Sequence, residues 1–195
     1  KLVVETVGSF AASELRPRAR ACSEARKLPD EALARAHELG LVASALPEEH
    51  GGGGERSAVT MSLVIEELAW GDLALALAIL SPALLAFPLA DFGSAAQQAA
   101  LLPRFAADAF VPGALALLEP AFGADPFRPR TQAKRDGAQY VLDGVKCLVP
   151  WLPGGDTVLV FADDGGEPQG FLVPRTAAGL EATPAAYMGI QAFPT

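Results

Sequence analysis

The stretch Ala114–Trp151 reads ALALLEPAFGADPFRPRTQAKRDGAQYVLDGVKCLVPW and decides how the second half of the chain folds. It opens on an apolar run that predicts a strand over Gly113–Leu118, and Glu119-Pro120 ends that strand. Further along, Asp136-Gly137 and Asp143-Gly144 are strong signals for tight two-residue turns between antiparallel strands. The stretch therefore predicts a region of short strands joined by turns.

Turn residues divide the rest of the second half in the same way. Strands are expected over Gly113–Leu118, Thr131–Arg135, Gln139–Leu142, Val145–Val149, Thr157–Ala162 and Gly170–Val173, with a further candidate at Leu180–Thr183. This spacing predicts an antiparallel meander that forms a β-sandwich or a partly closed barrel.

The first half of the chain has helical periodicity instead. Apolar residues recur at helical spacing, and Ser57 and Ser94 stand where helix caps belong. At Val111-Pro112-Gly113 the sequence pattern changes from helical periodicity to short apolar runs separated by turn residues. We therefore expect an α+β protein with an all-α helical domain over residues 1–112 and an incomplete middle β-domain over residues 113–195.

Composition limits the class of protein. The chain has 195 residues, 51% of them hydrophobic and 19% charged, with a net charge of -8. A negative field argues against non-specific nucleic-acid binding. The low charge content suggests that further sequence or a partner covers part of the surface. The two isolated cysteines fit a reducing cytosol, so a cytoplasmic location is expected.

Two segments resemble functional elements but have simpler explanations. Leu73–Ala90 carries no charge, but Pro82 and Pro88 interrupt it, so a buried core helix is expected in preference to a membrane span. Gly51–Gly54 lacks the Lys-Ser/Thr ending of a phosphate-binding loop, so a flexible connection between helices is expected. No metal-ligand spacing is present.

Ten residues of the opening stretch carry a family resemblance: Glu119, Pro120, Gly123, Asp125, Thr131, Ala133, Tyr140, Leu142, Gly144 and Lys146. Their order resembles the acyl-CoA dehydrogenase signature A-x-T-E-P-x-A-G-S-D, T-x-A, Y-x-L-N-G-x-K-x-W-I-T. The segment AAYMGIQAFPT near the end is similar to the family's M-G-I-R-x-x-P-T. The resemblance covers nearly the whole chain but about the first half of a family member, so the C-terminal helical domain is expected to be missing.

The resemblance implies a site for FAD and an acyl-CoA substrate, in fatty acid or sterol side-chain metabolism. The implied cofactor-binding residues are Leu115, Ala116, Leu117, Leu118, Glu119, Leu148, Val149 and Pro150, and the implied substrate-binding residues are Ala124 and Asp125. The family's catalytic base lies in the C-terminal domain, so no catalytic residue is expected here, and no metal is implied.

The departures from the family pattern concern the flavin site. Leu118 replaces a Thr, Leu148 replaces a Trp, and Pro150 replaces a Thr, while Ala124 replaces a Ser. Each hydrogen bond to a buried polar edge is worth roughly 0.5–1.5 kcal/mol, so the combined loss predicts weak or lost FAD binding.

Three functions remain open. The first is an FAD-dependent acyl-CoA dehydrogenase, or its N-terminal portion, that is inactive as this chain alone. The second is a non-catalytic subunit with a degenerate flavin site that completes a partner chain's active site. The third is an acyl-CoA-binding module. The expected partners are acyl-CoA and a C-terminal helical domain or a second dehydrogenase-like chain, in a homo- or hetero-oligomer.

Overall fold

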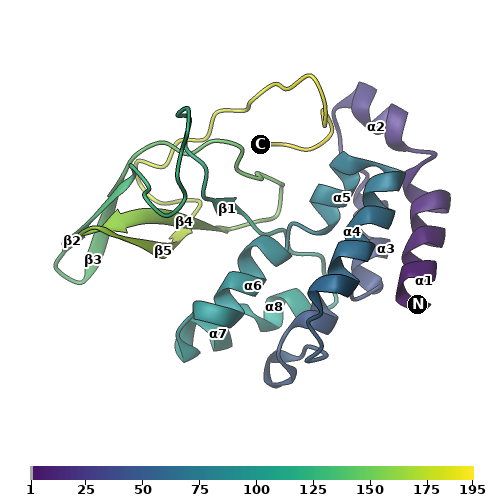
Figure 1. Cartoon of the computed structure of the whole chain (residues 1–195), viewed down its shortest axis with the longest axis horizontal. Coiled ribbons are helices and arrows are strands. Elements are labelled where there is room, and N and C mark those ends of the chain that lie inside the picture. The colour runs from purple at the N-terminus through teal and green to yellow at the C-terminus, as the bar shows by residue number, and fades with distance from the viewer. Residues whose placement is uncertain (1) are drawn as a thin grey trace.

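The computed structural model describes residues 2–195, with the helices at one end of the molecule and the sheet at the other (Figure 1). The α-helices are α1 (Leu2–Phe10), α2 (Ala19–Ala25), α3 (Asp30–Glu38), α4 (Ala58–Gly71), α5 (Leu73–Ile79), α6 (Ala83–Phe92), α7 (Ala95–Leu101) and α8 (Pro103–Ala106). A π-helical segment, Ala11–Leu15, extends α1, and short 3-10 turns lie at Ala43–Ala45 and Glu48–His50. The strands are β1 (Leu115–Ala116), β2 (Gln132–Asp136), β3 (Gln139–Asp143), β4 (Thr157–Asp164) and β5 (Glu167–Pro174). The expected α+β class is confirmed.

Side-chain caps and glycine set the helix ends. Ser94 forms a capping box with Gln97 before α7, in which each accepts a hydrogen bond from the other's backbone N–H, at 3.3 and 2.8 Å. Asp72 accepts a hydrogen bond from the Leu75 N–H at the start of α5. Gly40 follows α3 with a φ of 66°, a left-handed conformation that glycine adopts without steric cost.

The single core helix expected over Leu73–Ala90 is instead two helices. α5 ends at Ile79 and α6 begins at Ala83, because Pro82 cannot supply the N–H that a continuous helix needs. α5 is largely buried, as expected, whereas α6 buries one face through Leu85, Ala86 and Leu89. Among residues 2–195, no one helix has the length and apolar character to cross a membrane. By those two criteria alone the pair α5–α6 qualifies, with a bend of 40° between its members.

Of the three apolar clusters among the described residues, two show how the helices pack with one another and with the sheet. The first lies within the helices, where α1 packs along α4 and α3 contacts α5, with Leu15, Leu68 and Leu75 almost fully buried. The second joins the helices to the sheet, because Leu159 of β4 packs among buried side chains such as Leu102. The ion pair between Arg104 and Asp156 links the same two parts at 2.8 Å. The apolar contacts fix the orientation of the sheet relative to the helices, and the exposed ion pair adds little to them.

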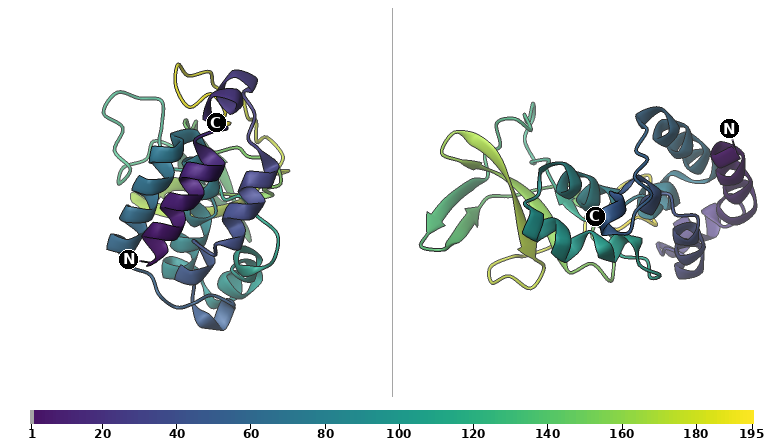
Figure 2. Two further views of the ribbon diagram at one scale, coloured as in Figure 1. Left: turned by 90° about the vertical axis from the view of Figure 1, so that its right-hand side faces the viewer. Right: turned by 90° about the horizontal axis from the view of Figure 1, so that it is seen from below.

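The sheet is mixed, and β4 is its central strand. β1 and β2 pair with β4 at different points along its length, β3 pairs with β2, and β5 pairs with β4 from end to end. β2–β3 and β4–β5 are antiparallel hairpins whose two-residue connections contain Gly137 and Gly165-Gly166. β1 and β2, however, both run parallel to β4. Figure 2 shows the sheet projecting away from the helical part, with the long β4–β5 pair nearer to the helices.

The expected antiparallel meander is therefore wrong in part. Turn signals predict an antiparallel pair where two residues join the strands, but the longer connections before β2 and β4 leave room for parallel pairing. Val145–Val149 forms no strand and is bent at Leu148, and Leu180–Thr183 forms no strand either. Asp143-Gly144 is consequently not a hairpin turn; it begins an irregular segment that runs to β4.

Candidate functional site

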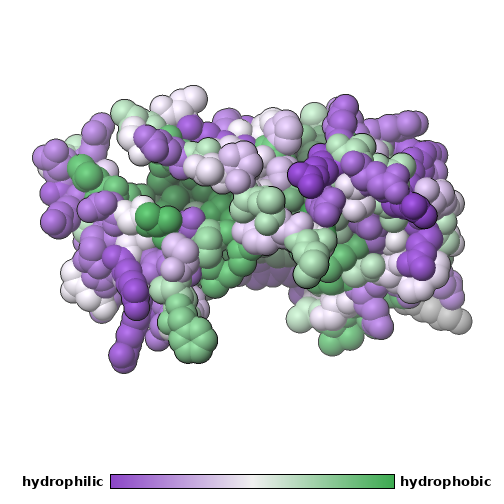
Figure 3. Space-filling model, turned by 90° about the horizontal axis from the view of Figure 1, so that it is seen from above, coloured by the Kyte–Doolittle hydropathy of each residue, from purple (hydrophilic) through white to green (hydrophobic). Residues whose placement is uncertain are grey.

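A groove of about 1560 Å³ lies against the sheet, between its strands and the C-terminal part of the chain. Its apolar lining comes from the end of β1, from β3, β4 and β5, and from the irregular segment that follows β3; this lining includes Ala116, Leu142, Leu148, Val149, Trp151, Val158, Val160, Phe171, Val173 and Leu180. Figure 3 shows apolar side chains in a hollow over the sheet end of the molecule, with polar residues around it. The groove is large enough for a ligand of cofactor size.

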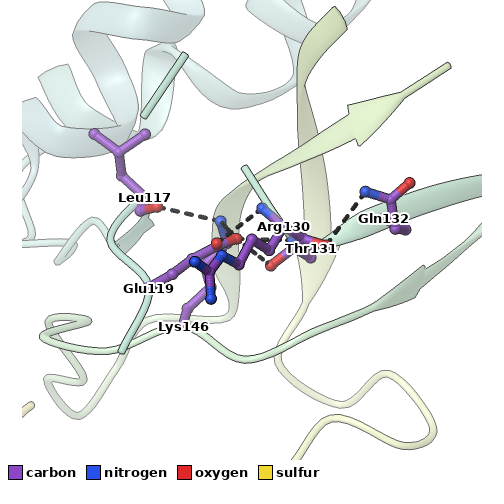
Figure 4. Close-up of polar contacts among 6 residues, drawn as sticks. All are labelled: Leu117, Glu119, Arg130, Thr131, Gln132 and Lys146. Atoms are coloured by element: carbon purple, nitrogen blue, oxygen red, sulfur yellow. Dashed lines mark hydrogen bonds and ion pairs between the residues drawn. The ribbon is translucent and has the colours of Figure 1, made fainter. Parts of the chain in front are cut away.

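A buried ion pair stands at the edge of this groove (Figure 4). The Lys146 ammonium group lies 2.9 Å from Glu119 Oε1, and the two side chains are 9% and 8% exposed. Thr131 donates to the same carboxylate oxygen from its backbone N–H at 2.8 Å and from its hydroxyl at 2.7 Å. The Arg130 N–H donates to Oε2 at 2.8 Å, and Lys146 also donates to the Leu117 carbonyl at 3.1 Å.

These contacts determine the charge state of Glu119. Burial by itself raises the pKa of the carboxyl group, because it penalises the charged form. The hydrogen bonds from Thr131, Lys146 and Arg130 outweigh burial and lower the pKa to about 2. At neutral pH the group is ionised and is a very weak proton acceptor, so it is unsuited to be a general base.

The end of β1 contributes backbone to this arrangement. Ala116 is buried and lines the groove, whereas Leu115 packs against the cluster that joins helices and sheet. The Leu118 carbonyl accepts a hydrogen bond from the Cys147 N–H at 2.9 Å, and Lys146 holds the carbonyl of Leu117. The strand end and the segment after Gly144 are thus tied to each other by main-chain contacts.

Of the three expected cofactor-binding residues that follow β3, two line the groove and one does not. Leu148 and Val149 line the groove, and the Leu148 side chain is 47% exposed. Leu148 has a φ of 55°, a left-handed backbone conformation that is uncommon for a residue other than glycine, asparagine or aspartate. Pro150 is buried and is not part of the groove lining.

The expected substrate-binding residues lie outside the groove. Ala124 and Asp125 sit in the loop between β1 and β2, where Asp125 Oδ1 accepts a hydrogen bond from the Phe127 N–H at 2.9 Å. Neither residue is part of the groove lining. The same loop exposes the aromatic side chains of Phe122 and Phe127. Of the expected cofactor-binding residues, only Ala116, Leu148 and Val149 are part of the lining.

Sequence reasoning missed two features of the site. Lys146 and Thr131 were matches to a motif, but nothing in their spacing showed that both bind Glu119. Arg175, at the end of β5, places its guanidinium group 4.1 Å from the centroid of the Trp151 ring and donates to the Leu152 carbonyl at 2.7 Å. Burial lowers the pKa of Arg175, and the nearby Asp156 opposes that effect. Trp151 and Arg175 lie 24 positions apart, so no local pattern reveals the pair.

Among residues 2–195, no group of three or more His, Cys, Asp or Glu side chains could hold a metal ion. The groove offers an apolar surface, backbone groups at the end of β1, and a fixed charge pair at its edge. Such a surface suits the binding and orientation of a planar, largely apolar ligand.

Comparison with known proteins gives consistent results along the whole chain. The family described as "Acyl-CoA dehydrogenase, N-terminal domain" matches residues 1–109. The acyl-CoA dehydrogenase FadE12 of Mycobacterium tuberculosis is 35% identical over 160 residues, which cover 79% of this chain and 41% of the relative. The probable acyl-CoA dehydrogenase YngJ of Bacillus subtilis is 31% identical over 200 residues, or 98% of this chain and 52% of the relative.

Solved structures extend the similarity to the sheet. A glutaryl-CoA dehydrogenase from Mycobacterium smegmatis in complex with FADH2 aligns with 98% of this chain and 50% of its own, at 30% identity and a TM-score of 0.86. An acyl-CoA dehydrogenase complexed with FAD from Bacillus anthracis aligns with 99% of this chain and 33% of its own, at 26% identity and a TM-score of 0.77. The chain spans about half the length of the curated relatives it matches.

Proposed function

Because the chain belongs to the acyl-CoA dehydrogenase family, we propose that it provides the flavin- and thioester-binding part of an enzyme that desaturates an acyl-CoA between Cα and Cβ. The observation that carries this proposal is the groove beside β1. Two segments far apart in sequence, Leu115–Glu119 and Lys146–Trp151, meet at its edge. They contain the residues that the family resemblance predicts to contact the flavin, Leu115–Glu119 and Leu148–Pro150.

The residues present fit a flavin ring in size and polarity. The groove lining is mostly apolar, as the ring system requires. Leu148 and Val149 are part of it, and the Leu117 and Leu118 carbonyls are bonded to Lys146 and Cys147 of the groove wall. The side chains of Leu118 and Leu148 supply no hydroxyl or aromatic contact. We therefore propose that FAD binds here mainly through apolar contact and backbone hydrogen bonds, and less tightly than in relatives that keep those side chains.

The bound flavin would supply the hydride acceptor of the reaction. The role of this chain is then to orient the ring and the thioester and to exclude water from them. Removal of the α-proton needs a base within hydrogen-bond reach. Glu119 is unsuited to that task because of its low pKa, and Asp125 lies outside the groove. We propose that the base comes from a further helical domain or a partner chain.

An exposed helix surface supports the need for such a partner. Apolar side chains on α4 and α5 are exposed, namely Val59, Leu63, Ile65, Trp70, Leu73 and Leu77. An apolar surface of this extent commonly packs against another element. A C-terminal helical domain or a second dehydrogenase-like chain would bury it.

A second candidate function is a non-catalytic subunit that completes a partner's active site. The observation that favours it is the joint loss of polar and aromatic groups at Leu118, Leu148 and Pro150. Such a chain would keep the scaffold of the groove without turning over substrate. An acyl-CoA-binding module without redox chemistry is the weakest of the three alternatives.

The test is a chimera in which this chain is continued by the C-terminal part of YngJ. We would measure acyl-CoA-dependent reduction of an artificial electron acceptor with short, medium and long acyl chains. Activity of the chimera, with none from the chain alone, supports the dehydrogenase. Activity that appears only after Leu118→Thr and Pro150→Thr supports the non-catalytic subunit. If neither chimera binds FAD or turns over substrate, the proposal is wrong.

A further inference from the structure

The Glu119–Lys146 ion pair has no place in acid–base chemistry, yet it is the most elaborate polar cluster at the groove. All four donors that contact Glu119 come from this chain, and they occupy both carboxylate oxygens. Lys146 also donates a second hydrogen bond, to the Leu117 carbonyl. Buried charges are costly unless they are fully paired, so a cluster this complete has a structural task at this position.

The cluster connects three segments that are distant in sequence. Glu119 follows β1, Thr131 precedes β2, and Lys146 follows β3. The Thr131 carbonyl accepts a hydrogen bond from the Asp163 N–H in β4 at 2.8 Å, so the cluster is anchored to the middle of the sheet. The cluster can therefore hold segments that are not paired with any strand in a fixed position relative to the sheet.

The segment that most needs such support is residues 144–151. It has no strand partner, and the backbone hydrogen bonds that hold it include those from Cys147 to the Leu118 carbonyl and from Trp151 to the Pro194 carbonyl, both 2.9 Å. Yet this segment forms one wall of the groove, with Lys146, Leu148 and Trp151 among the lining residues. Because residues 144–151 are not paired with a strand, the conformation of this wall depends on the few hydrogen bonds that tie it to the rest of the chain.

Leu148 shows that the wall is held under strain. A left-handed conformation costs an ordinary residue about 1–2 kcal/mol and persists where the surroundings determine it. The Leu148 side chain is 47% exposed, so its own packing offsets little of that cost. Two fixed points precede it in sequence: the Cys147 N–H, which donates to the Leu118 carbonyl, and the Lys146 ammonium group, which is held by Glu119 and Leu117.

We propose that the Glu119–Lys146 pair positions the groove wall: it fixes the end of β1 against residues 144–151 and so holds Leu148 and Val149 in the conformation that receives the ligand. Glu119 and Lys146 are positioning residues in this role. They act through the backbone and make no contact with the reacting atoms. That the ligand is a flavin rests on the proposed function; the positioning itself does not.

The first arm of the test uses the unliganded chain. Amide hydrogen exchange is compared between the wild type, Lys146→Met and a control, Arg104→Gln, which removes the exposed ion pair between α8 and Asp156, the residue before β4. We expect exchange in residues 144–151 to rise about tenfold or more in Lys146→Met, with β4 and β5 unchanged, and no change there in the control. Unchanged exchange in residues 144–151 overturns the proposal.

The second arm measures FAD binding by fluorescence well below each variant's unfolding temperature. We expect the dissociation constant to rise about tenfold in Lys146→Met, the equivalent of one charge-assisted hydrogen bond, and to stay unchanged in Arg104→Gln. An equal affinity in Lys146→Met and wild type contradicts the positioning role. If the wild type binds no FAD, the proposed function fails, and the exchange measurement still decides the positioning role.

A milder variant protects the test against misfolding. Thr131→Val removes the hydroxyl donor at 2.7 Å while it keeps the backbone donor and the approximate volume. We expect the same changes in exchange in the same segment, at a smaller amplitude. Should Lys146→Met not fold, a Thr131→Val protein with wild-type exchange in residues 144–151 would overturn the proposal.

Discussion

Replacement of Glu119 by glutamine gives a prediction whose size follows from the structure. Folding lowers the pKa of the carboxyl group from an ordinary value of 4.5 to about 2. One pH unit corresponds to about 1.36 kcal/mol, so the ionised carboxylate contributes about 3 kcal/mol to the free energy of unfolding at neutral pH. The side chain is 8% exposed, so solvent screening reduces this contribution little.

The direction of the Glu119 pKa change on folding determines the pH range over which its contribution to stability is lost. A carboxylate whose pKa is lower in the folded state stabilises the protein fully above the pKa of the unfolded chain. That contribution is lost as the pH falls from about 4.5 to about 2, because the unfolded chain takes up the proton first. Glu119→Gln has no proton to bind at this position, so it lacks this part of the pH dependence.

Urea unfolding at pH 6, 4.5, 3.5 and 2 measures the effect. We expect the wild type to be the more stable protein at pH 6, and the difference from Glu119→Gln to shrink by about 3 kcal/mol between pH 6 and pH 2. Other carboxyl groups titrate in both proteins and cancel in the difference. A difference that stays constant with pH would refute the reasoning.

Three further predictions concern local geometry and ligand binding. Gly144→Ala should destabilise the fold by about 1–3 kcal/mol in urea unfolding, because the added Cβ would lie 2.7 Å from Thr131 Cα. The matched control Gly137→Ala lies at an open turn with a φ of 61° and should cost the smaller amount, about 1 kcal/mol. Equal costs for the two substitutions would contradict the contact with Thr131. Ser94→Ala should lower the stability by about 1 kcal/mol through loss of the capping box, seen as a lower unfolding temperature. Leu118→Thr should strengthen FAD binding, measured by fluorescence titration, and an unchanged affinity would argue against a hydroxyl contact at this position.

Sequence reasoning succeeded where local chemistry decides the outcome. The caps at Ser57 and Ser94 and the hairpin at Gly137 each follow from one or two residues, and the structure contains all of them. The family resemblance drawn from Glu119, Lys146 and their neighbours is confirmed by the family match and by the solved structures.

Long-range pairing was beyond the sequence. The parallel pairing of β1 and β2 with β4 depends on packing across connections of a dozen residues or more, for which turn signals carry no information. Likewise, the segment Val145–Val149, where a strand was expected, is held by the Lys146 side chain and by the end of β1 and not by pairing with another strand. The contact between Arg175 and Trp151 is invisible to any pattern along the chain.

The position of Ala124 and Asp125 illustrates a further limit. The resemblance implied that both contact substrate, and that remains a prediction. Their loop connects β1 to β2 and lies away from the groove lining. Sequence motifs can align residues with a family, but the position of an exposed loop depends on what packs against it.

The central claim is that the groove beside β1 holds a flavin, and the visible absorption spectrum tests it most directly. The purified chain is incubated with excess FAD, freed of unbound cofactor by gel filtration and scanned through the flavin bands. We expect bound flavin in the wild type, more in Leu118→Thr, and less in Lys146→Met than in Arg104→Gln. A wild-type protein without flavin bands, whose Leu118→Thr variant also lacks them, would contradict the account.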